Sequence, residues 1–229
     1  MAMQLEEVVP FGRTLDEYIQ MFNLTEGDRH KSILSVADGP ASFNAEGTRL
    51  GYRIKSVDPL YVFSAHQIQQ RFDAVVDKIM GQIKQTPDDW VWTYHHSLNQ
   101  LRNNREKAIQ LFCEDYSLGQ QEDRYEVGEL PALKYADDEY ELCLSSHFLF
   151  LYSEHLDESF HLSSMIEMLR VCKEVRVFPL LTLMLKPSPH LQPIIEQLEA
   201  RGFICTIQTV PYELQRGGNQ MLKITQATD

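Results

Sequence analysis

Short apolar segments alternate with amphipathic helical patterns along this chain, and this alternation restricts the fold more than any other feature. The segments that resemble strands are 32–37, 52–57, 124–128, 141–151 and part of 174–185. The helical patterns between them end near Arg49, begin at Ser64, and span about 104–118 and 159–172. Strands that alternate with helices of about 10 to 15 residues are typical of a doubly wound α/β sheet with helices on both faces.

The two ends of this pattern carry further elements. Thr14 and Glu17 predict a capping box that opens a first helix over 14–24, and Ser64 and Gln67 predict a second capping box. A helix that begins at Ser188-Pro189 is predicted to end at Gly202. Segments 203–210 and 220–226 then follow, separated by Gly217-Gly218, and predict a closing antiparallel hairpin.

The charge of the chain argues against a polyanionic partner. Lys and Arg number 21 against 33 Asp and Glu, which gives a net charge of −12, and no dense basic patch interrupts this balance. Such a chain repels phosphate backbones. We therefore expect a small molecule or a protein as its partner and not a nucleic acid.

The apolar and cysteine content indicates a cytoplasmic protein with a packed core. Hydrophobic residues make up 43% of the chain, yet the longest apolar stretch, 178–185, is far short of the roughly 20 residues that cross a bilayer. Residues 1–7 lack the basic and apolar regions of a secretory leader, so neither export nor membrane insertion is expected. The cysteines form no CxxC pair and are predicted to be buried, reduced thiols: Cys113, Cys143, Cys172 and Cys205.

Polar and small residues follow the predicted strands, where the carboxyl ends of a doubly wound sheet bind ligands. A turn rich in small residues, 37–42, follows the first strand. Asp58 follows the second strand, 20 positions after Asp38, near the spacing at which an acidic residue binds the ribose of an adenosine cofactor. Segments 129–131 and 145–148 end the next two strands.

These segments resemble the class I S-adenosylmethionine-dependent methyltransferases over residues 14–226. The resemblance rests on residues 33–42 for the first loop, 56–59 for the acidic end of the second strand, and 129–147 for an acidic-Leu-Pro segment, an aspartate-rich turn and the fourth strand. It implies a mostly parallel, seven-stranded Rossmann-like sheet with an antiparallel hairpin at its carboxyl end. It also implies one domain over 1–229, a bacterial-type member and S-adenosyl-L-methionine as cofactor.

The resemblance assigns roles to the strand ends. The loop around Gly39 would line the methionine and ribose, Asp58 would accept the ribose hydroxyls, and Pro59 with Glu129 would lie near the adenine. The backbone of 145–147 would face the methionine amine and the methyl group. The implied cofactor-binding residues are Ala37, Asp38, Gly39, Pro40, Asp58, Pro59, Glu129, Leu130, Ser145 and Ser146.

The first loop departs from the family pattern. Ser35 stands where an acidic residue is usual, and Ala37 and Ala41 stand where glycines are common. Asp38 could supply the missing carboxylate, or the methionine could be held differently. Each strand end also has a simpler interpretation: an ordinary turn at 38–40, a strand stop at Asp58, or a solvated surface charge at Glu129.

His147 is the candidate catalytic residue, because an imidazole at the ligand edge can orient a substrate or accept a proton. A structural histidine that bonds a loop carbonyl is the alternative. Ser146 precedes it, but the chain has no G-x-S-x-G elbow, and adjacent positions are not expected to place a nucleophile and a base at bonding distance. The aromatic cluster 90–96, within a connector over 85–105, is either a cap that faces the substrate or a packed connector.

Other functions are also consistent with parts of the pattern. A degenerate methyltransferase fold without catalysis would fit the altered first loop. A nicotinamide-dependent oxidoreductase is disfavoured, because no G-x-G-x-x-G follows the first strand. A metal site is not expected, since no helical spacing unites the available side chains: His95, His96, Glu114, His155 and His161.

Overall fold

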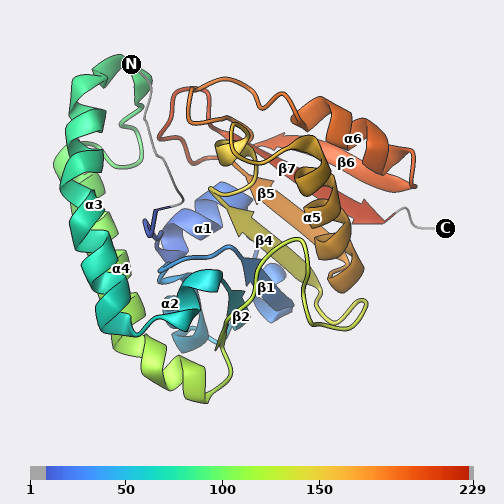
Figure 1. Ribbon diagram of the computed structural model, residues 1–229, viewed down its shortest axis with the longest axis horizontal. Helices are drawn as coiled ribbons and strands as arrows, with labels where there is room; N and C mark the ends of the chain where they lie inside the picture. The colour runs from blue at the N-terminus through green and yellow to red at the C-terminus, as the bar shows by residue number, and fades with distance from the viewer. Residues whose placement is uncertain (1–8, 227–229) are drawn as a thin grey trace.

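A computed structural model describes residues 9–226, and its central element is a seven-stranded sheet (Figure 1). The strands are β1 (Ser32–Val36), β2 (Arg53–Val57), β3 (Tyr125–Glu126), β4 (Leu142–Ser146), β5 (Glu174–Phe178), β6 (Phe203–Thr209) and β7 (Gln220–Gln226). Their order across the sheet is β3-β2-β1-β4-β5-β7-β6. The first five strands are parallel, and β7 runs antiparallel to both β5 and β6. The predicted doubly wound sheet and closing hairpin are therefore confirmed.

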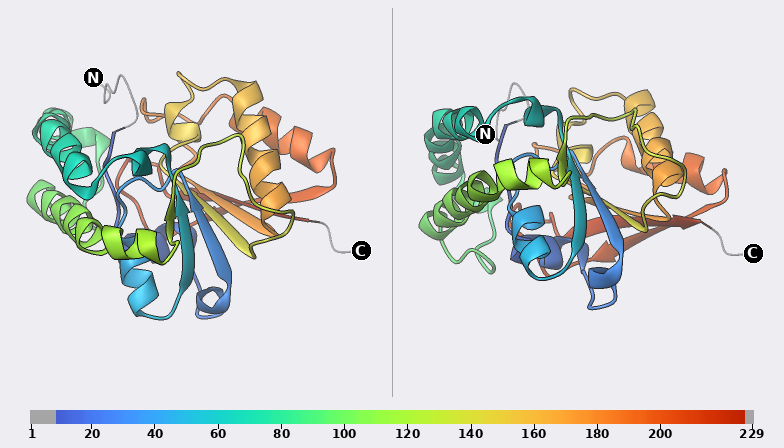
Figure 2. Two further views of the ribbon diagram at one scale, coloured as in Figure 1. Left: turned by 60° about the horizontal axis from the view of Figure 1, so that its bottom comes forward. Right: turned by 90° about the horizontal axis from the view of Figure 1, so that it is seen from below.

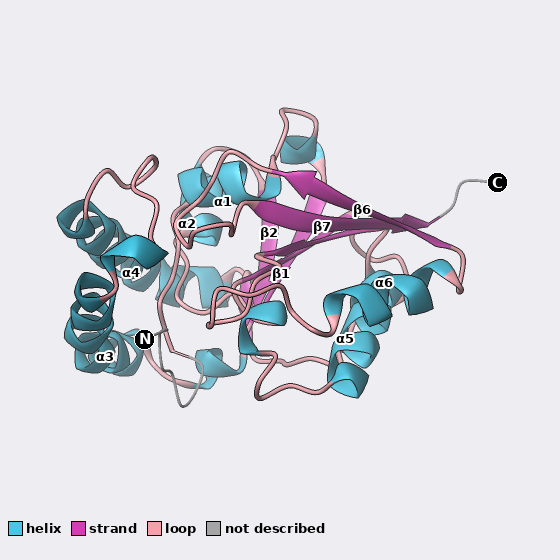
Figure 3. Cartoon of the chain, turned by 90° about the horizontal axis from the view of Figure 1, so that it is seen from above, coloured by secondary structure: helices cyan, strands magenta, loops and turns pink. Residues whose placement is uncertain are grey.

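Helices cover both faces of this sheet. They are α1 (Leu15–Phe22), α2 (Phe43–Arg49), α3 (Ala65–Gln85), α4 (Leu98–Gln121), α5 (Glu158–Val171) and α6 (Leu191–Glu199). Figure 3 shows α5 and α6 on the side of the sheet opposite to α1, while α3 and α4 pack side by side beyond the strands. The same pairing of α3 with α4 is visible in both views of Figure 2.

The alternation of side chains along each strand builds two cores. Ile33 and Leu142 point to the face covered by α1, α3 and α4. Leu34 and Cys143 point to the face covered by α5 and α6. All four side chains are fully buried, as expected for central parallel strands with helices on both sides.

Both predicted capping boxes are present. The Thr14 hydroxyl accepts the amide of Glu17 while the Glu17 carboxylate accepts the amide of Thr14, and Ser64 and Gln67 bond in the same way. These reciprocal bonds satisfy amides that the first turn of a helix leaves free. The starts of α1 and α3 thus follow from their local sequence.

Several boundaries differ from the expected ones, most of all in the fourth helix and the fourth strand. The helix expected over 104–118 begins at Leu98, because the Ser97 side chain caps it, and it continues to Gln121. The fourth strand ends at Ser146 and not at 151, because His147 adopts a left-handed backbone conformation with a φ of 53°. Residues 150–152 then form a 3-10 turn. The last part of the connector expected over 85–105, from Leu98 onward, therefore belongs to α4.

The cysteine prediction is partly wrong. Cys143 and Cys172 are buried, whereas Cys113 and Cys205 are partly exposed, and all four are free thiols. Cys205 is partly exposed because β6 is an edge strand, and neighbouring Ile204 is also exposed.

Within residues 9–226, no helix combines the length and apolar character needed to cross a membrane. The expectation for residues 1–7 lies outside the described part of the chain.

Candidate functional site

The ends of β1 and β2 meet at the carboxyl edge of the sheet, next to the point where the strand order reverses. Asp58 follows β2, and its Oδ2 accepts the amide hydrogen of Gly39, which follows β1, at 2.8 Å. The Tyr61 hydroxyl donates to the carbonyl oxygen of Gly39 at 2.8 Å. Two segments that the sequence predicts to share a ligand are therefore in direct contact.

Asp38 lies in a cluster of hydroxyl groups beneath the loop. Its carboxylate accepts hydrogen bonds from Ser35 at 2.5 Å, from Ser56 at 2.7 Å and from the Tyr18 hydroxyl. Burial raises the pKa of Asp38, and these hydroxyl bonds oppose that rise. The Asp38 carboxylate thus lies against the Ser35 side chain, and its hydrogen bonds are made to the protein itself.

Asp58 retains the capacity to bind further donors. Its Oδ1 accepts the amide of Leu60 at 2.7 Å, in addition to the bond from Gly39. A carboxylate has about four lone-pair sites, so about two remain for ligand hydroxyls. Burial raises the pKa of Asp58 to about 6, and the two amide bonds counteract part of this rise. Above that pH the group is an anionic acceptor.

The first loop leaves room over its glycine. Gly39 has a φ of 53°, and a side chain added there would meet no described heavy atom within 4 Å. Ala37 shares the left-handed conformation, with a φ of 54°. Open space over a half-buried glycine loop, beside a carboxylate with free acceptor sites, fits the ribose and methionine portions of S-adenosylmethionine.

The other predicted cofactor residues are less clearly gathered. Pro59 is exposed at the start of a 3-10 turn after β2. Glu129 is exposed, whereas Leu130 is buried in the core beneath α5 and α6. Ser145 is fully buried at the end of β4, and its Oγ has no hydrogen-bond partner within residues 9–226.

His147 lies just beyond β4 and is neutral at pH 7. Burial, together with the charges of Arg13 and Arg105, lowers the pKa of His147 well below its usual value. Its amide donates to the carbonyl oxygen of Phe178 at 2.6 Å. The Ser146 Oγ lies 2.9 Å from its Nδ1, so the expectation that these adjacent side chains cannot reach bonding distance is wrong.

Residues 11–14 lie directly on the first loop. The carbonyl oxygen of Arg13 accepts the amide of Ser42 at 3.0 Å. Gly12 approaches so closely that an added Cβ would lie 2.1 Å from the carbonyl oxygen of Pro40. This segment therefore occupies part of the surface at the start of α2 and requires glycine at position 12.

A buried ion pair, which no local sequence pattern predicts, anchors this segment. Both Nη atoms of Arg105 bond the carboxylate of Glu17, at 2.7 and 2.6 Å, and both side chains are fully buried. The Tyr212 hydroxyl donates to Glu17 at 3.0 Å, and His95 Nε2 lies 3.4 Å from the same oxygen. Arg105 follows Leu101 by four positions and precedes Ile109 by four, so its place on an apolar helix face was the available clue.

The aromatic cluster 90–96 divides between two environments. Trp90 is buried, and its indole nitrogen donates to Thr86 at 2.9 Å. His95 is fully buried within the Glu17 network, where burial lowers its pKa. No group of three or more His, Cys, Asp or Glu side chains suited to a metal ion occurs among the described residues.

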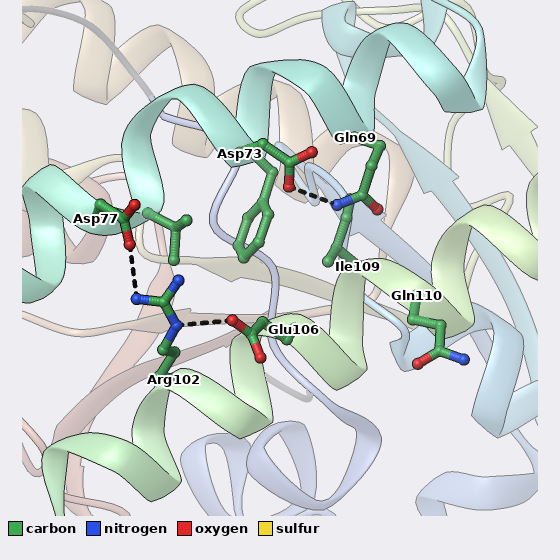
Figure 4. A pocket seen from close by; sticks show the side chains of 9 residues that line it. Gln69, Asp73, Asp77, Arg102, Glu106, Ile109 and Gln110 are labelled. Atoms are coloured by element: carbon green, nitrogen blue, oxygen red, sulfur yellow. Dashed lines mark hydrogen bonds and ion pairs between the residues drawn. The ribbon is translucent and has the colours of Figure 1, made fainter.

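A broad polar hollow of about 390 Å³ lies between α3 and α4 (Figure 4). Its charged groups bond one another: Arg102 contacts Asp77 and Glu106, each at 2.7 Å. Gln69 donates to Asp73 at 2.8 Å. Because these polar groups are already satisfied, the hollow presents little unpaired chemistry.

Comparison with known proteins agrees with this architecture. The fold is that of the class I S-adenosylmethionine-dependent methyltransferases. The solved structure of the mitomycin 7-O-methyltransferase MmcR aligns with 93% of this chain at a TM-score of 0.50 and 11% identity. The chain spans 54% of MmcR. Magnesium protoporphyrin IX methyltransferase from Synechocystis PCC 6803, solved with bound SAM, aligns with 93% of the chain and 78% of its own length, at a TM-score of 0.48 and 10% identity.

A sequence relative defines the family more closely. The uncharacterized protein MJ0045 of Methanocaldococcus jannaschii is 33% identical over 226 residues, which cover 97% of this chain and 98% of that protein. The chain belongs to the family of this protein. The relative is archaeal, so the expectation of a bacterial-type member is not supported. No family model matches the chain.

Proposed function

We propose that this chain is an S-adenosylmethionine-dependent methyltransferase, that residues 1–229 form one domain, and that the methyl acceptor is a small molecule or a protein. The observation that carries the proposal is the contact between Asp58 and Gly39 at the carboxyl edge of a methyltransferase sheet. It joins an anionic acceptor with free lone pairs to a loop with open space above it.

The strand ends would divide the cofactor between them. Asp58 would accept the ribose hydroxyls, and the backbone of Ala37 to Pro40 would lie against the ribose and methionine. Pro59, Glu129 and Leu130 would border the adenine, and the segment that includes Ser145 and Ser146 would face the amine.

The protein residues then have mainly to position the acceptor. S-adenosylmethionine supplies a methyl group that is activated by a positively charged sulfur. The protein contributes alignment of the acceptor, which is a large part of the catalytic effect for such a reaction. His147, neutral and adjacent to the cofactor edge, would orient the acceptor or take its proton, and the connector over 85–105 would close the acceptor side.

A methyltransferase fold that binds partners without catalysis is the second candidate. It is favoured by one observation: the amides of Gly39 and Ser42, at the start of α2, already donate to Asp58 and to the carbonyl oxygen of Arg13. In this case the loop would be closed by the protein itself. S-adenosylhomocysteine would then not bind.

Calorimetric titration with S-adenosylhomocysteine tests the proposal. The wild-type chain should bind it, and Asp58→Asn should weaken binding by about tenfold or more, the effect of a lost charged hydrogen bond. Asp88→Asn, at an exposed site, is the control and should bind normally. Stabilisation by NAD(H) in place of S-adenosylhomocysteine would reject the proposal, and binding of neither would favour the second candidate.

A further inference from the structure

A small cavity of about 60 Å³, partly open to solvent, lies beyond the end of β4, and its walls are mostly apolar. Six separate segments supply them, among them α3, the connector after it and the loop between β6 and β7. The apolar lining residues include Phe11, Ile79, Ile83, Leu151, Leu183 and Leu214. Such a lining selects a ligand with an apolar body.

Arg13 and His147 add polar groups to this lining. The Arg13 side chain is partly exposed, but its Nε is buried and has no hydrogen-bond partner within residues 9–226. The one hydrogen bond of its guanidinium in that part of the chain runs from Nη1 to the carbonyl oxygen of Phe11, at 2.5 Å. Several donors of Arg13 are therefore available to a ligand.

The positive charge of Arg13 is not matched locally. The carboxylate that acts on it, Glu17, is held by both Nη atoms of Arg105. Burial and the like charge of Arg105 lower the pKa of Arg13 to about 10, so it remains protonated at pH 7. The pKa of His147 is also lowered, so that ring is neutral. Arg13 is therefore the charged member of this pair of lining residues. A cation held at an apolar wall is costly unless an anion pairs with it.

The cavity lies on the acceptor side of the proposed site. The residues predicted to hold the cofactor all lie within residues 9–226, and none of them lines the cavity. His147, the candidate that would face the transferred methyl, does line it. The cavity thus adjoins the proposed cofactor site at His147, which directly follows Ser146.

We propose that this cavity binds a small, largely apolar methyl acceptor that carries one carboxylate, and that Arg13 holds the carboxylate. The role of this ligand as a methyl acceptor rests on the proposed function, but binding of the anion itself does not require the cofactor. Arg13 is assigned a fork-like contact with two carboxylate oxygens, the geometry for which guanidinium is suited.

Benzoate and its neutral isostere benzamide are the probes, with binding followed by ligand-observed NMR and calorimetry. Benzoate should bind more tightly than benzamide, and Arg13→Gln should reduce benzoate affinity by about tenfold or more while leaving benzamide unchanged. Arg102→Gln, a surface change in α4, is the matched control. Leu183→Phe fills the cavity and leaves Arg13 in place, so it should abolish binding of both probes even if the arginine variant fails to fold.

The same variants separate the possible sources of the anion. S-adenosylhomocysteine carries a carboxylate, whereas 5′-methylthioadenosine does not. If Arg13→Gln weakens S-adenosylhomocysteine alone, with benzoate and 5′-methylthioadenosine unaffected, Arg13 serves the cofactor and the inference is overturned. Equal affinity for benzoate and benzamide overturns it as well. Arg13-dependent binding of benzoate by a chain that binds neither nucleoside would instead uphold the anion site and reject the proposed function.

Discussion

The ion pair of Glu17 and Arg105 gives the sharpest test of how this fold is held together. Both side chains have no exposed surface, and the pair joins α1 to α4. Burial alone would raise the pKa of Glu17, but Arg105 and His95 outweigh it and hold the pKa well below the usual value. The replacement Glu17→Gln keeps the size of the side chain and one oxygen that can accept the capping bond from Thr14. It removes the charge and turns the oxygen that faces Arg105 and Tyr212 into an NH2 group.

The expected loss is large because Arg105 would remain buried without its counter-charge. Removing one member of a buried pair costs about 3–5 kcal/mol in free energy of unfolding. For a chain of this length each kcal/mol corresponds to about 2–4 °C in Tm, so the Tm should fall by roughly 6–20 °C. Replacing both members, as in Glu17→Gln with Arg105→Met, should recover part of the loss, since no buried charge is then left unpaired.

Urea unfolding followed by circular dichroism, together with thermal unfolding, measures this effect. Glu106→Gln is the control, because Glu106 pairs with Arg102 at the surface of the same helix. That exposed pair is worth about 0–1 kcal/mol. If Glu17→Gln lost no more stability than Glu106→Gln, the buried pair would not support the fold as argued. The stability from Glu17 should also be present at neutral pH and decline only as the pH falls below its unfolded pKa.

Three further predictions concern the strand ends. Because Asp58 has a raised pKa of about 6, S-adenosylhomocysteine affinity measured by calorimetry should fall by up to about tenfold per pH unit below that pH, and Asp58→Asn should remove this dependence. Gly12→Ala places a methyl group against the Pro40 carbonyl and should cost about 1–3 kcal/mol in urea unfolding, whereas an unchanged midpoint would contradict the close approach. Tyr18→Phe removes a donor to buried Asp38 and should cost about 1–3 kcal/mol in the same assay, with a neutral result showing that the carboxyl does not need this bond.

The strand and helix pattern was predictable because the deciding interactions are local. The capping pair of Thr14 and Glu17 is three residues apart, and a short apolar run marks each buried strand. The end of β4 was less predictable, since residues 148–151 continue the apolar pattern. Only the left-handed backbone at His147 ends the strand there, and an apolar pattern does not reveal a backbone dihedral angle.

The contacts within the site were predictable only in part. The placement of Asp58 and Gly39 at one edge follows from the rule that parallel strands end at the same side of a sheet, whereas the direct hydrogen bond between them was not predicted. The partners of Glu17 lie 88 and 195 positions away, at Arg105 and Tyr212, and no local pattern encodes such a distance. The sequence marks Glu17 as a capping residue, which is correct, but its second role depends on tertiary packing.

One short segment connects the proposed cofactor loop, the cavity and the buried ion pair. Gly12 rests on Pro40 of the first loop, Arg13 lines the cavity, and Glu17 pairs with Arg105 in α4. A ligand that bound Arg13 would therefore act on the same segment that covers the loop. A ligand stabilises the conformation to which it binds. An anion in the cavity should therefore also favour the conformation in which residues 11–14 lie on the loop. Acceptor and cofactor binding would then be linked through this segment, and the linkage would act equally in both directions.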